Sequence, residues 1–537
     1  MRFVHVTLAV VLGCGASSSP EPDAAPTEAE RSWRDEVVYQ LLTDRFGNGR
    51  VDNDTGETCS TCYLGGDWVG INQRLDYLQD LGVTAIWISP IATNVDDVIG
   101  GGYHGFWPLA LDQANPRFGT EEELRTLVDA CHDRGIKVLV DVVLNHMGQV
   151  FFYDLNGNGQ PDPGELDPPF NADGIDAPIV FKDAVSPAGF LNPDWYHRRG
   201  GIQNFDDPLQ ALTGDFEGGL RDLDTARQDV RDALLEVTLD WLDRVPFDGI
   251  RFDAAKHVDE DFWPWFLGEL RAARPGLVAV AEAFEGDVTR LSRFTDELAF
   301  DSVLDFSYKY QAFNDVFAAN QPTTRLRDLY VAQSQALNPV PHQGGAGLAP
   351  QLIPFRFLDN HDVPRFMSTA GDVRAVKAAL AYLMTLDGVP VIYYGTEQDF
   401  SGAEDPENRE ALWTSDYLTD GDTFVWLRRL ISLRAELTAL RRGDVRFVWT
   451  SSRQDAGDGA GLVGIERVLA DERVLVVVNT RASEAETAAG GTGMQVGFEP
   501  GTVLEDRLTN GESLTVGDDG RITVQMPGYG ARIYTAR

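Results

Sequence analysis

Eight short apolar runs that alternate with amphipathic segments constrain the fold of this chain more than any other feature. The amphipathic segments include 120–134, 227–243 and 373–386. Apolar runs separated by helical patterns are typical of parallel strands joined by crossover helices, and eight of them predict an α/β fold of the (β/α)8 TIM barrel type rather than an open sheet. We expect the strands at 37–42, 83–89, 136–144, 247–253, 277–283, 302–306, 354–359 and 389–394.

Two regions depart from this alternation. Residues 147–215, after the third strand, are rich in Pro, Gly, Asp and Asn and too long for a plain connection, so they predict an inserted subdomain at the active face of the barrel. Residues 439–537 carry short alternating strands with Gly and Asp turns, which predict a C-terminal antiparallel β-sandwich. The barrel would then comprise residues 33–146 and 216–438.

The N-terminus has the pattern of an export signal. Its apolar run, Phe3 to Leu12, is too short to span a bilayer, and Gly13-Cys14 follows it. This resembles a bacterial lipoprotein signal at residues 1–14, which would leave Cys14 lipidated and residues 15–32 as a flexible tether. An ordinary secretory signal is the alternative. Either signal predicts export, to the cell surface or periplasm or into the medium, with membrane contact only through a lipid anchor.

Charge and cysteine content narrow the partners and the compartment. A net charge of -39 makes nucleic acid an unfavourable partner. Cys59 and Cys62 could form a disulfide in an oxidising compartment, and zinc is less favoured because no second Cys or His pair accompanies them. Cys131 lies in a helical pattern and is expected to be a buried apolar residue.

Polar side chains directly follow several of the expected strands. The carboxyl ends of barrel strands meet at one mouth, where the active sites of this fold lie. Four strand ends therefore bring carboxylates, histidines and an arginine together. They supply Asn145 and His146, Arg251, Asp253, Lys256 and His257, Glu282, and His361 and Asp362.

The motifs at these strand ends resemble those of the alpha-amylase family, glycoside hydrolase family 13. DVVLNH, GIRFDAAKH, AVAEA and FLDNHD appear in the family's order, and the likeness runs from Val37 to Tyr394, with the β-rich tail matching the family's C-terminal domain. DRFGNG, GGDWVGI, YHGFW, NHDVPRF and YYGTEQDFSGAEDPENRE are most similar to cyclodextrin glucanotransferases and the bacterial amylases near them. The resemblance implies an α-glucan substrate.

Retaining hydrolysis of a glycosidic bond needs a carboxylate nucleophile and a protonated carboxyl about 5 to 5.5 Å apart. Asp253 is the expected nucleophile, because Arg251, two residues earlier on the same strand, can keep it ionised. Glu282 is the expected acid/base, since apolar neighbours and a nearby negative charge raise its pKa. The resemblance assigns Asp362 to gripping sugar hydroxyls.

The resemblance also implies the residues that bind the sugar chain. His146 and His361 would bind the same sugar as Asp362, Lys256 and His257 would lie on the leaving-group side, and Asp405 and Arg409 would hold a sugar on the other side. The Gly-flanked loop 101–107 would offer rings for stacking, with Phe106 where the family usually has tyrosine. The loop contributes Tyr103, His104, Phe106 and Trp107.

Three groups of oxygen-bearing residues predict one to three Ca²⁺ sites. The resemblance implies a site made by Asn145, Asp222 and the carbonyl of His257. The stretch DLNGNGQPDPGE has the spacing of an EF-hand loop, with a turn cluster that holds no ion as the alternative; its ligands would be Asp154, Asn156, Asn158, the Gln160 carbonyl, Asp162 and Glu165. The third group resembles a glucanotransferase site, although Arg50 stands where a ligand is expected; it comprises Asn48, Asn53, Asp54, the Gly65 carbonyl and Asp67.

Hydrolase and transferase differ in whether water or a sugar hydroxyl resolves the covalent intermediate. Two features favour an α-amylase that cuts α-1,4 bonds internally in starch, glycogen or maltooligosaccharides. Gly218 stands where cyclising enzymes carry an aromatic residue, and the chain has one β domain where those enzymes carry more. An α-glucanotransferase is the alternative, and an inactive glycan-binding lipoprotein is a remote one. We expect a monomer.

Overall fold

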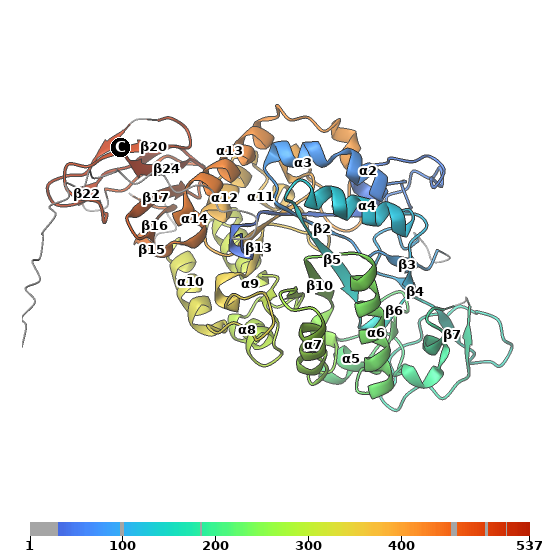
Figure 1. Ribbon diagram of the computed structural model, residues 1–537. Coiled ribbons are helices and arrows are strands. Elements are labelled where there is room, and N and C mark those ends of the chain that lie inside the picture. The colour runs from blue at the N-terminus through green and yellow to red at the C-terminus, as the bar shows by residue number, and fades with distance from the viewer. Residues whose placement is uncertain (1–30, 97–100, 183–184, 453–458, 489–491, 512) are drawn as a thin grey trace, which may run out of the picture.

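Figure 1 shows the computed structural model, which describes residues 31–96, 101–182, 185–452, 459–488, 492–511 and 513–537. The predicted signal peptide, Cys14 and nearly all of the predicted tether lie outside these residues. Within them, each helix is too short or too polar to cross a membrane.

Eight parallel strands form one sheet in the order β12-β11-β10-β5-β2-β1-β14-β13. An isolated parallel bridge between Leu304 and Phe355 joins its two edges, so the sheet closes into a barrel. This confirms the predicted TIM barrel, and each strand lies inside one of the eight predicted runs. The strands are β1 (Val38–Leu41), β2 (Ala85–Ile88), β5 (Lys137–Val143), β10 (Gly249–Asp253), β11 (Val278–Ala281), β12 (Ser302–Val303), β13 (Phe355–Phe357) and β14 (Val389–Tyr393).

Helices surround the barrel, and local sequence explains how they start. Thr120 caps α4 in a capping box with Glu123, and the buried face of that helix repeats through Leu124, Leu127 and Val128 to Cys131. The buried thiol of Cys131 is therefore core, as predicted. The helices of the ring are α3 (Leu75–Leu81), α4 (Glu121–His132), α6 (Gln228–Arg244), α7 (Phe262–Ala273), α8 (Val288–Asp296), α10 (Thr324–Ala336), α12 (Val373–Thr385) and α13 (Asp422–Glu436).

The strands are buried on both faces, which is why they read as continuous apolar runs. Alternate residues such as Leu139 and Val280 fill the barrel interior, whereas Val138 and Ile250 pack outward against the helices. Above this apolar interior, Asp141 and Arg251 are paired in register on β5 and β10. The interior thus changes from apolar to charged at the C-terminal mouth.

The inserted segment after β5 holds little regular structure. Its β6 (His146–Met147) pairs with β9 (Arg221–Asp222), β7 (Phe151–Tyr153) pairs with β8 (Ile179–Phe181), and α5 (Pro208–Thr213) follows. It nevertheless has a core of its own, because Arg221 is buried against the Phe151 and Tyr153 rings and bonds to Asp215 at 2.6 Å. In Figure 1 this segment, marked by β7, lies at the opposite end of the molecule from the C-terminal domain.

The C-terminal domain is built on a six-stranded antiparallel sheet, consistent with the predicted β-sandwich, and two two-stranded sheets accompany it. Its own apolar cluster includes Leu475, Val477 and Ile522. The main sheet contains β15 (Asp444–Trp449), β16 (Leu462–Leu469), β17 (Glu472–Asn479), β24 (Ala531–Ala536), β20 (Val503–Asp506) and β21 (Leu514–Thr515), and the small sheets pair β18 (Ala485–Glu486) with β23 (Gln525–Met526) and β19 (Met494–Gln495) with β22 (Arg521–Ile522).

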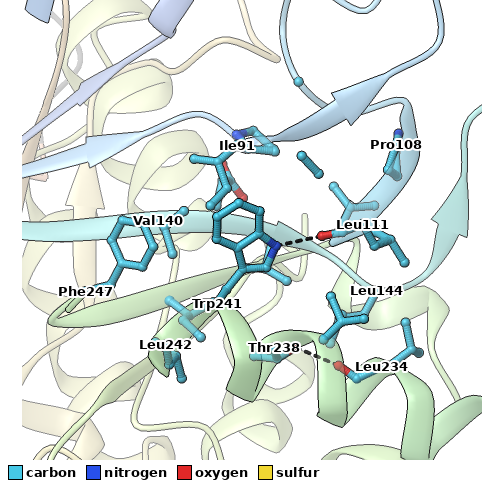
Figure 2. A pocket seen from close by; sticks show the side chains of 18 residues that line it. Ile91, Pro108, Leu111, Val140, Leu144, Leu234, Thr238, Trp241, Leu242 and Phe247 are labelled. Atoms are coloured by element: carbon cyan, nitrogen blue, oxygen red, sulfur yellow. Dashed lines mark hydrogen bonds between the residues drawn. The ribbon is translucent and has the colours of Figure 1, made fainter. Parts of the chain in front are cut away.

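A small apolar cavity of about 50 Å³ lies between α6 and the strands β5 and β10 (Figure 2). Trp241 reaches into it and donates its indole N–H to the Leu111 carbonyl at 2.6 Å. Its walls are mostly aliphatic, so they offer few hydrogen-bond partners to sugar hydroxyls. Substrate chemistry belongs to a different cavity.

Candidate active site

A cavity of about 300 Å³ opens at the C-terminal ends of the barrel strands. It collects residues from the ends of β10 and β11, from the loops after β2, β5, β13 and β14, and from the inserted segment. Nine of the residues predicted from the sequence line it. Those nine are His104, Phe106, His146, Asp253, Glu282, His361, Asp362, Asp405 and Arg409, and they are joined by Phe216, Leu220, Ala254 and Phe284.

Arg251 is fully buried at the base of this cavity and joins three carboxylates. Its Nη1 lies 2.9 Å from Asp253 Oδ1 and 2.6 Å from Asp141 Oδ1, and its Nη2 lies 2.5 Å from Glu282 Oε1. One guanidinium therefore holds Asp253 and Glu282 close together.

The carboxyls of this cluster titrate above their ordinary range. Burial raises the pKa of Asp253 well above its usual value and also raises the pKa of Glu282, while Arg251 opposes both shifts. Burial raises the pKa of Asp362 as well, against the charges of Arg409 and Arg251. Arg251 pairs with Asp253 and also with Glu282, so this guanidinium alone does not separate the nucleophile from the acid.

The backbone at the two strand ends is constrained. The Ala254 N–H donates to Glu282 Oε2 at 2.9 Å, which links the residue after Asp253 to the second carboxylate. Ala254 and Phe284 both adopt left-handed conformations, at φ of 49° and 45°. Strained backbone at a non-glycine residue persists where the surroundings over-determine it, which is common at functional sites.

Sequence reasoning did not include Asp141 among the site residues, although the residue opens the motif DVVLNH. Its carboxylate contacts Arg251 from within the barrel and accepts the Trp87 indole N–H at 3.0 Å. Burial raises the pKa of Asp141 to about 7, with Arg251 opposing the shift. The alternation along β5 was the available signal, since it places Asp141 on the interior face with Leu139.

Burial disfavours the charged form of the three histidines in the cavity. Burial lowers the pKa of His146 to about 4 and lowers the pKa of His104 and His361 well below the usual range. The Gln40 amide nitrogen lies 2.8 Å from His361 Nδ1. With Nδ1 accepting, the ring proton sits on Nε2, which lies 3.1 Å from Asp362 Oδ2.

The predicted aromatic loop reaches the cavity only in part. Phe106 lies parallel to His361 at a centroid distance of 4.8 Å, and its carbonyl lies 3.0 Å from His146 Nε2. Tyr103 is buried away from the cavity, and Trp107 turns its ring edge-on to His104 at 4.8 Å. The loop therefore presents Phe106 and His104, and not a row of three stacking rings.

Asp405 and Arg409 enter from the loop after β14. Arg409 pairs with Asp405 at 3.1 Å, lies 3.5 Å from Asp362, and donates to the Tyr103 hydroxyl at 3.1 Å. This brings together two residues whose roles were implied by resemblance alone.

Aromatic rings that sequence reasoning passed over lie near Lys256 and His257. Lys256 Nζ is 5.9 Å from the ring of Phe284, and the His257 ring packs edge-on to Phe216 at 4.8 Å and to Phe205 at 5.8 Å. Phe205 and Phe284 are 53% and 39% exposed, which is unusual for phenylalanine. The position of Phe284, two residues after Glu282, was the available signal.

Known proteins carry the same domain. The model of the alpha amylase catalytic domain matches residues 40–428. The chain belongs to the alpha-amylase family. An alpha-amylase of Saccharomycopsis fibuligera is 31% identical over 518 residues, covering 95% of this chain and 92% of that protein.

Solved structures of the family share the whole architecture. An Anoxybacillus alpha-amylase superposes with a TM-score of 0.77 at 27% identity, covering 94% of this chain and 99% of that one. CldA, a cyclomaltodextrin glucanotransferase with a three-domain ABC distribution, gives 0.75 at 26% identity, with 94% and 99% covered. This chain is a glycoside hydrolase of the alpha-amylase type.

Calcium is common in the family, and the structure places the three predicted groups differently. Asn145 and Asp222 are both buried where β6 pairs with β9, and the Leu223 N–H donates to the Asn145 carbonyl at 3.0 Å. Oxygen donors of this kind suit Ca²⁺. His197 Nδ1 lies 2.5 Å from one oxygen of Asp222, so that oxygen is shared with an imidazole.

The 154–165 loop closes on itself through hydrogen bonds to its own side chains. The Gly159 N–H donates to both oxygens of Asp154 at 3.2 Å, and Glu165 is buried and accepts the N–H groups of Leu155 and Asn156 at 2.9 and 3.2 Å. The other polar side chains of the loop also form hydrogen bonds within it. Asp162 Oδ2 accepts the side-chain amides of Asn156 and Asn158 at 2.8 and 2.7 Å, while Asn158 Oδ1 accepts the Gln160 N–H at 2.7 Å.

The third group is engaged otherwise. Asp67 caps α2 (Trp68–Gln73) through the Gly70 N–H at 2.6 Å and also accepts the Gly49 and Arg50 N–H groups. Asn48 and Asn53 donate their amides, to Asp54 at 2.8 Å and to the Arg117 carbonyl at 2.7 Å. Gly65 faces Asp54 and Asn48 so closely that a Cβ would collide with both. Backbone capping is thus the role that these contacts support for Asp67.

Proposed function

We propose that the protein hydrolyses α-1,4-glucosidic bonds within starch, glycogen or maltooligosaccharides, with retention of configuration. The observation that carries the proposal is the pair Asp253 and Glu282, both held by Arg251 in one cavity with Asp362. Retaining glycosidases need two carboxyls about 5 to 5.5 Å apart, and contact with one guanidinium keeps these two close together.

Asp253 would attack the anomeric carbon, and Glu282 would protonate the leaving oxygen and then take a proton from water. The raised pKa of Glu282 favours its protonated form, as an acid catalyst requires. Asp362, with the neutral Nε2–H of His361 beside it, would bind sugar hydroxyls. A partly ionised group of carboxyls around one fixed guanidinium suits the positive charge that develops on the sugar.

A glucanotransferase is the second candidate, and one observation favours it. CldA has the same three-domain extent as this chain, so the expectation that a single β domain separates amylases from cyclising enzymes is wrong. Gly218 still supports the hydrolase. A glycine offers no ring where the resemblance places the aromatic residue of cyclising enzymes, and open space lies where its Cβ would be.

We also propose that calcium binds the 154–165 loop and the Asn145–Asp222 site. The spacing of the oxygen-bearing residues in the loop, which closes through Asp154 and Glu165, supports the first, and the oxygen-only donor set supports the second. Bound calcium would supply positive charge that fixes these carboxylates and amides in place. The chemistry of bond cleavage would stay with Asp253 and Glu282.

The protein would work outside the cytoplasm. The Cys59–Cys62 disulfide, which realises the possibility raised by the sequence, supports an oxidising compartment. Export through the N-terminal signal, lipidation of Cys14 and a monomeric state remain predictions.

Incubation with soluble starch tests the activity. We expect new reducing ends to rise in step with a fall in chain length, giving linear oligosaccharides. Cyclic products, or disproportionated oligomers with few new reducing ends, would favour the transferase.

A further inference from the structure

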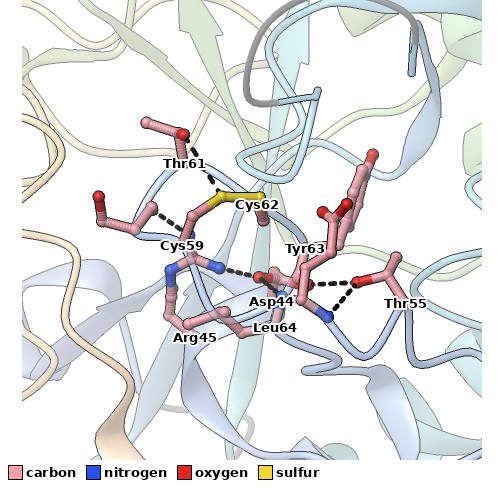
Figure 3. Close-up of a disulfide and its surroundings, with 10 residues drawn as sticks. Asp44, Arg45, Thr55, Cys59, Thr61, Cys62, Tyr63 and Leu64 are labelled. Carbon is pink, nitrogen blue, oxygen red and sulfur yellow. Dashed lines mark hydrogen bonds and ion pairs between the residues drawn. A yellow bond between two sulfur atoms is a disulfide. The ribbon is translucent and has the colours of Figure 1, made fainter.

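The Cys59–Cys62 disulfide closes a short surface loop directly beside a buried arginine (Figure 3). Cys59 and Ser60 are exposed, whereas Arg45 has no exposed surface. Arg45 Nη2 donates to the Ser60 carbonyl at 2.6 Å. The disulfide loop therefore supplies one of the acceptors that a buried guanidinium requires.

Arg45 Nη1 pairs with the neighbouring Asp44, and the two remaining contacts of Arg45 lead toward the active site. Its Nε donates to the Arg409 carbonyl at 3.0 Å, and its guanidinium carbon lies 3.9 Å from the centre of the Tyr103 ring. Tyr103 in turn accepts a hydrogen bond from Arg409 Nη1 at 3.1 Å. Arg45 thus fixes both the backbone of Arg409 and the ring that the Arg409 side chain contacts.

Arg409 lines the cavity and contacts Asp405 and Asp362. Arg45 is not among the residues that line it. A change at Arg45 would therefore reach the substrate through the position of Arg409.

The chain on either side of the disulfide is held in different ways. After Cys62, the Leu64 and Gly65 N–H groups donate to Asp44 side-chain oxygens at 2.8 and 3.2 Å, and the Asp67 N–H donates to the Gly47 carbonyl at 2.9 Å. Residues 59–62 are held by a turn, in which the Cys62 N–H donates to the Cys59 carbonyl at 3.1 Å, by the disulfide and by Arg45. Opening the disulfide would loosen Ser60 and leave residues 64–67 anchored.

We propose that the Cys59–Cys62 disulfide positions Arg409 through Arg45, so that the oxidised loop sets how tightly the cleft binds the sugar beside Asp405 and Asp362. The inference rests on the proposed function, and Arg45 is a positioning residue in it. Dithiothreitol would break the sulfur–sulfur bond and leave thiols on Cys59 and Cys62, while the reagent itself closes to a cyclic disulfide. The exposure of Cys59 gives the reagent access.

The test compares kcat and KM for maltoheptaose in oxidised protein, in protein reduced with dithiothreitol, and in the variant Cys59→Ser/Cys62→Ser. Because the position of Arg409 is loosened while Asp253 and Glu282 keep their contacts with Arg251, we expect KM to rise about fivefold, with kcat within about twofold. The double variant should not respond to the reagent. Arg45→Lys keeps the positive charge but loses the several N–H donors of the guanidinium, so it should raise KM similarly. Arg50→Lys, at a partly exposed arginine nearby, should leave KM unchanged.

Unchanged KM after reduction and in the double variant would overturn the inference. If Arg45→Lys loses its near-ultraviolet circular dichroism signal, the variant has lost its tertiary structure. The change in KM on reduction of the unaltered protein then tests the inference. Calorimetric binding of maltoheptaose to Asp253→Asn, with and without dithiothreitol, measures the grip without turnover. Equal affinities there would count against the inference, whereas lack of hydrolysis by the unaltered protein would count against the proposed function.

Discussion

At the scale of single residues, the site contains several buried carboxyls and two arginines that pair with them. Arg251 contacts Asp141, Asp253 and Glu282, and Arg409 is the second cation near Asp362. Burial and mutual repulsion raise the pKa of these acids, so protons are retained where a glycosidase needs one. The strand-end motifs predicted which residues meet, but not how they share one guanidinium, because that depends on side-chain packing across strands.

The pH profile tests this sharing. Asp141 raises the pKa of Asp253, so Asp141→Asn should lower it and leave Arg251 freer to stabilise the ionised nucleophile. Asp253 must be ionised for attack. The acidic limb of kcat/KM should therefore move to lower pH by roughly half a unit or more.

The matched control is Asp240→Asn, at an exposed aspartate of α6, which should leave the profile in place. An acidic limb that stays unchanged in Asp141→Asn would show that Asp141 does not set the titration of the nucleophile.

At the scale of elements, the sequence predicted the repeated strands of the barrel and missed features that occur once and depend on distant contacts. The eight strands follow from apolar runs because both faces of each strand are buried. The π-helical segment Lys309–Ala318 has no such signature, and the burial of Tyr103 follows from its contacts with Arg45 and Arg409, which are remote in sequence. The oxygen-rich spacing of the 154–165 loop is local and can be recognised in the sequence, and its calcium stays a prediction, whereas the aromatic core of the inserted segment carries no such local signal.

The calcium loop gives a prediction at this scale. Asp154→Ala removes the carboxylate that accepts the Gly159 N–H, so it should lower the melting temperature in calcium by roughly 2 °C. The variant should also show a smaller fall in melting temperature than the unaltered protein when a chelator removes calcium. Differential scanning calorimetry with calcium and with chelator measures both.

Asp173→Ala, at an exposed aspartate of the same inserted segment, is the control and should behave like the unaltered protein. A chelator-induced drop of full size in Asp154→Ala would mean that the loop holds no ion that stabilises the fold.

At the scale of the whole molecule, buried arginines connect the barrel to the C-terminal domain. Arg467, on β16, donates to the carbonyls of Leu440 and Gly443 at 2.8 and 2.7 Å and to that of Thr385, the last residue of α12. Burial lowers the pKa of Arg467 to about 10, yet the group stays charged at neutral pH. Sequence patterns predicted the two domains but carried no signal for this contact, since its acceptors are backbone carbonyls.

Arg467→Met should therefore destabilise the molecule strongly. The change removes the arginine donor from the buried carbonyls of Thr385 and Gly443, while the Leu440 carbonyl keeps Arg434 as a donor at 3.1 Å, and we expect a loss of about 2–5 kcal/mol in the free energy of unfolding. Urea denaturation measures it. Arg446→Met, on the neighbouring strand with its side chain 64% exposed, is the control, and equal midpoints for the two variants would refute the role of Arg467.

The most direct test of the central claim is proton nuclear magnetic resonance of the anomers released from maltopentaose. With Asp253 as nucleophile and water as acceptor, the α-anomer should appear first and convert to the β-anomer only by mutarotation. Asp253→Asn and Glu282→Gln should each reduce its release by at least about a thousandfold. Initial release of the β-anomer, or full activity of Asp253→Asn, would contradict the account.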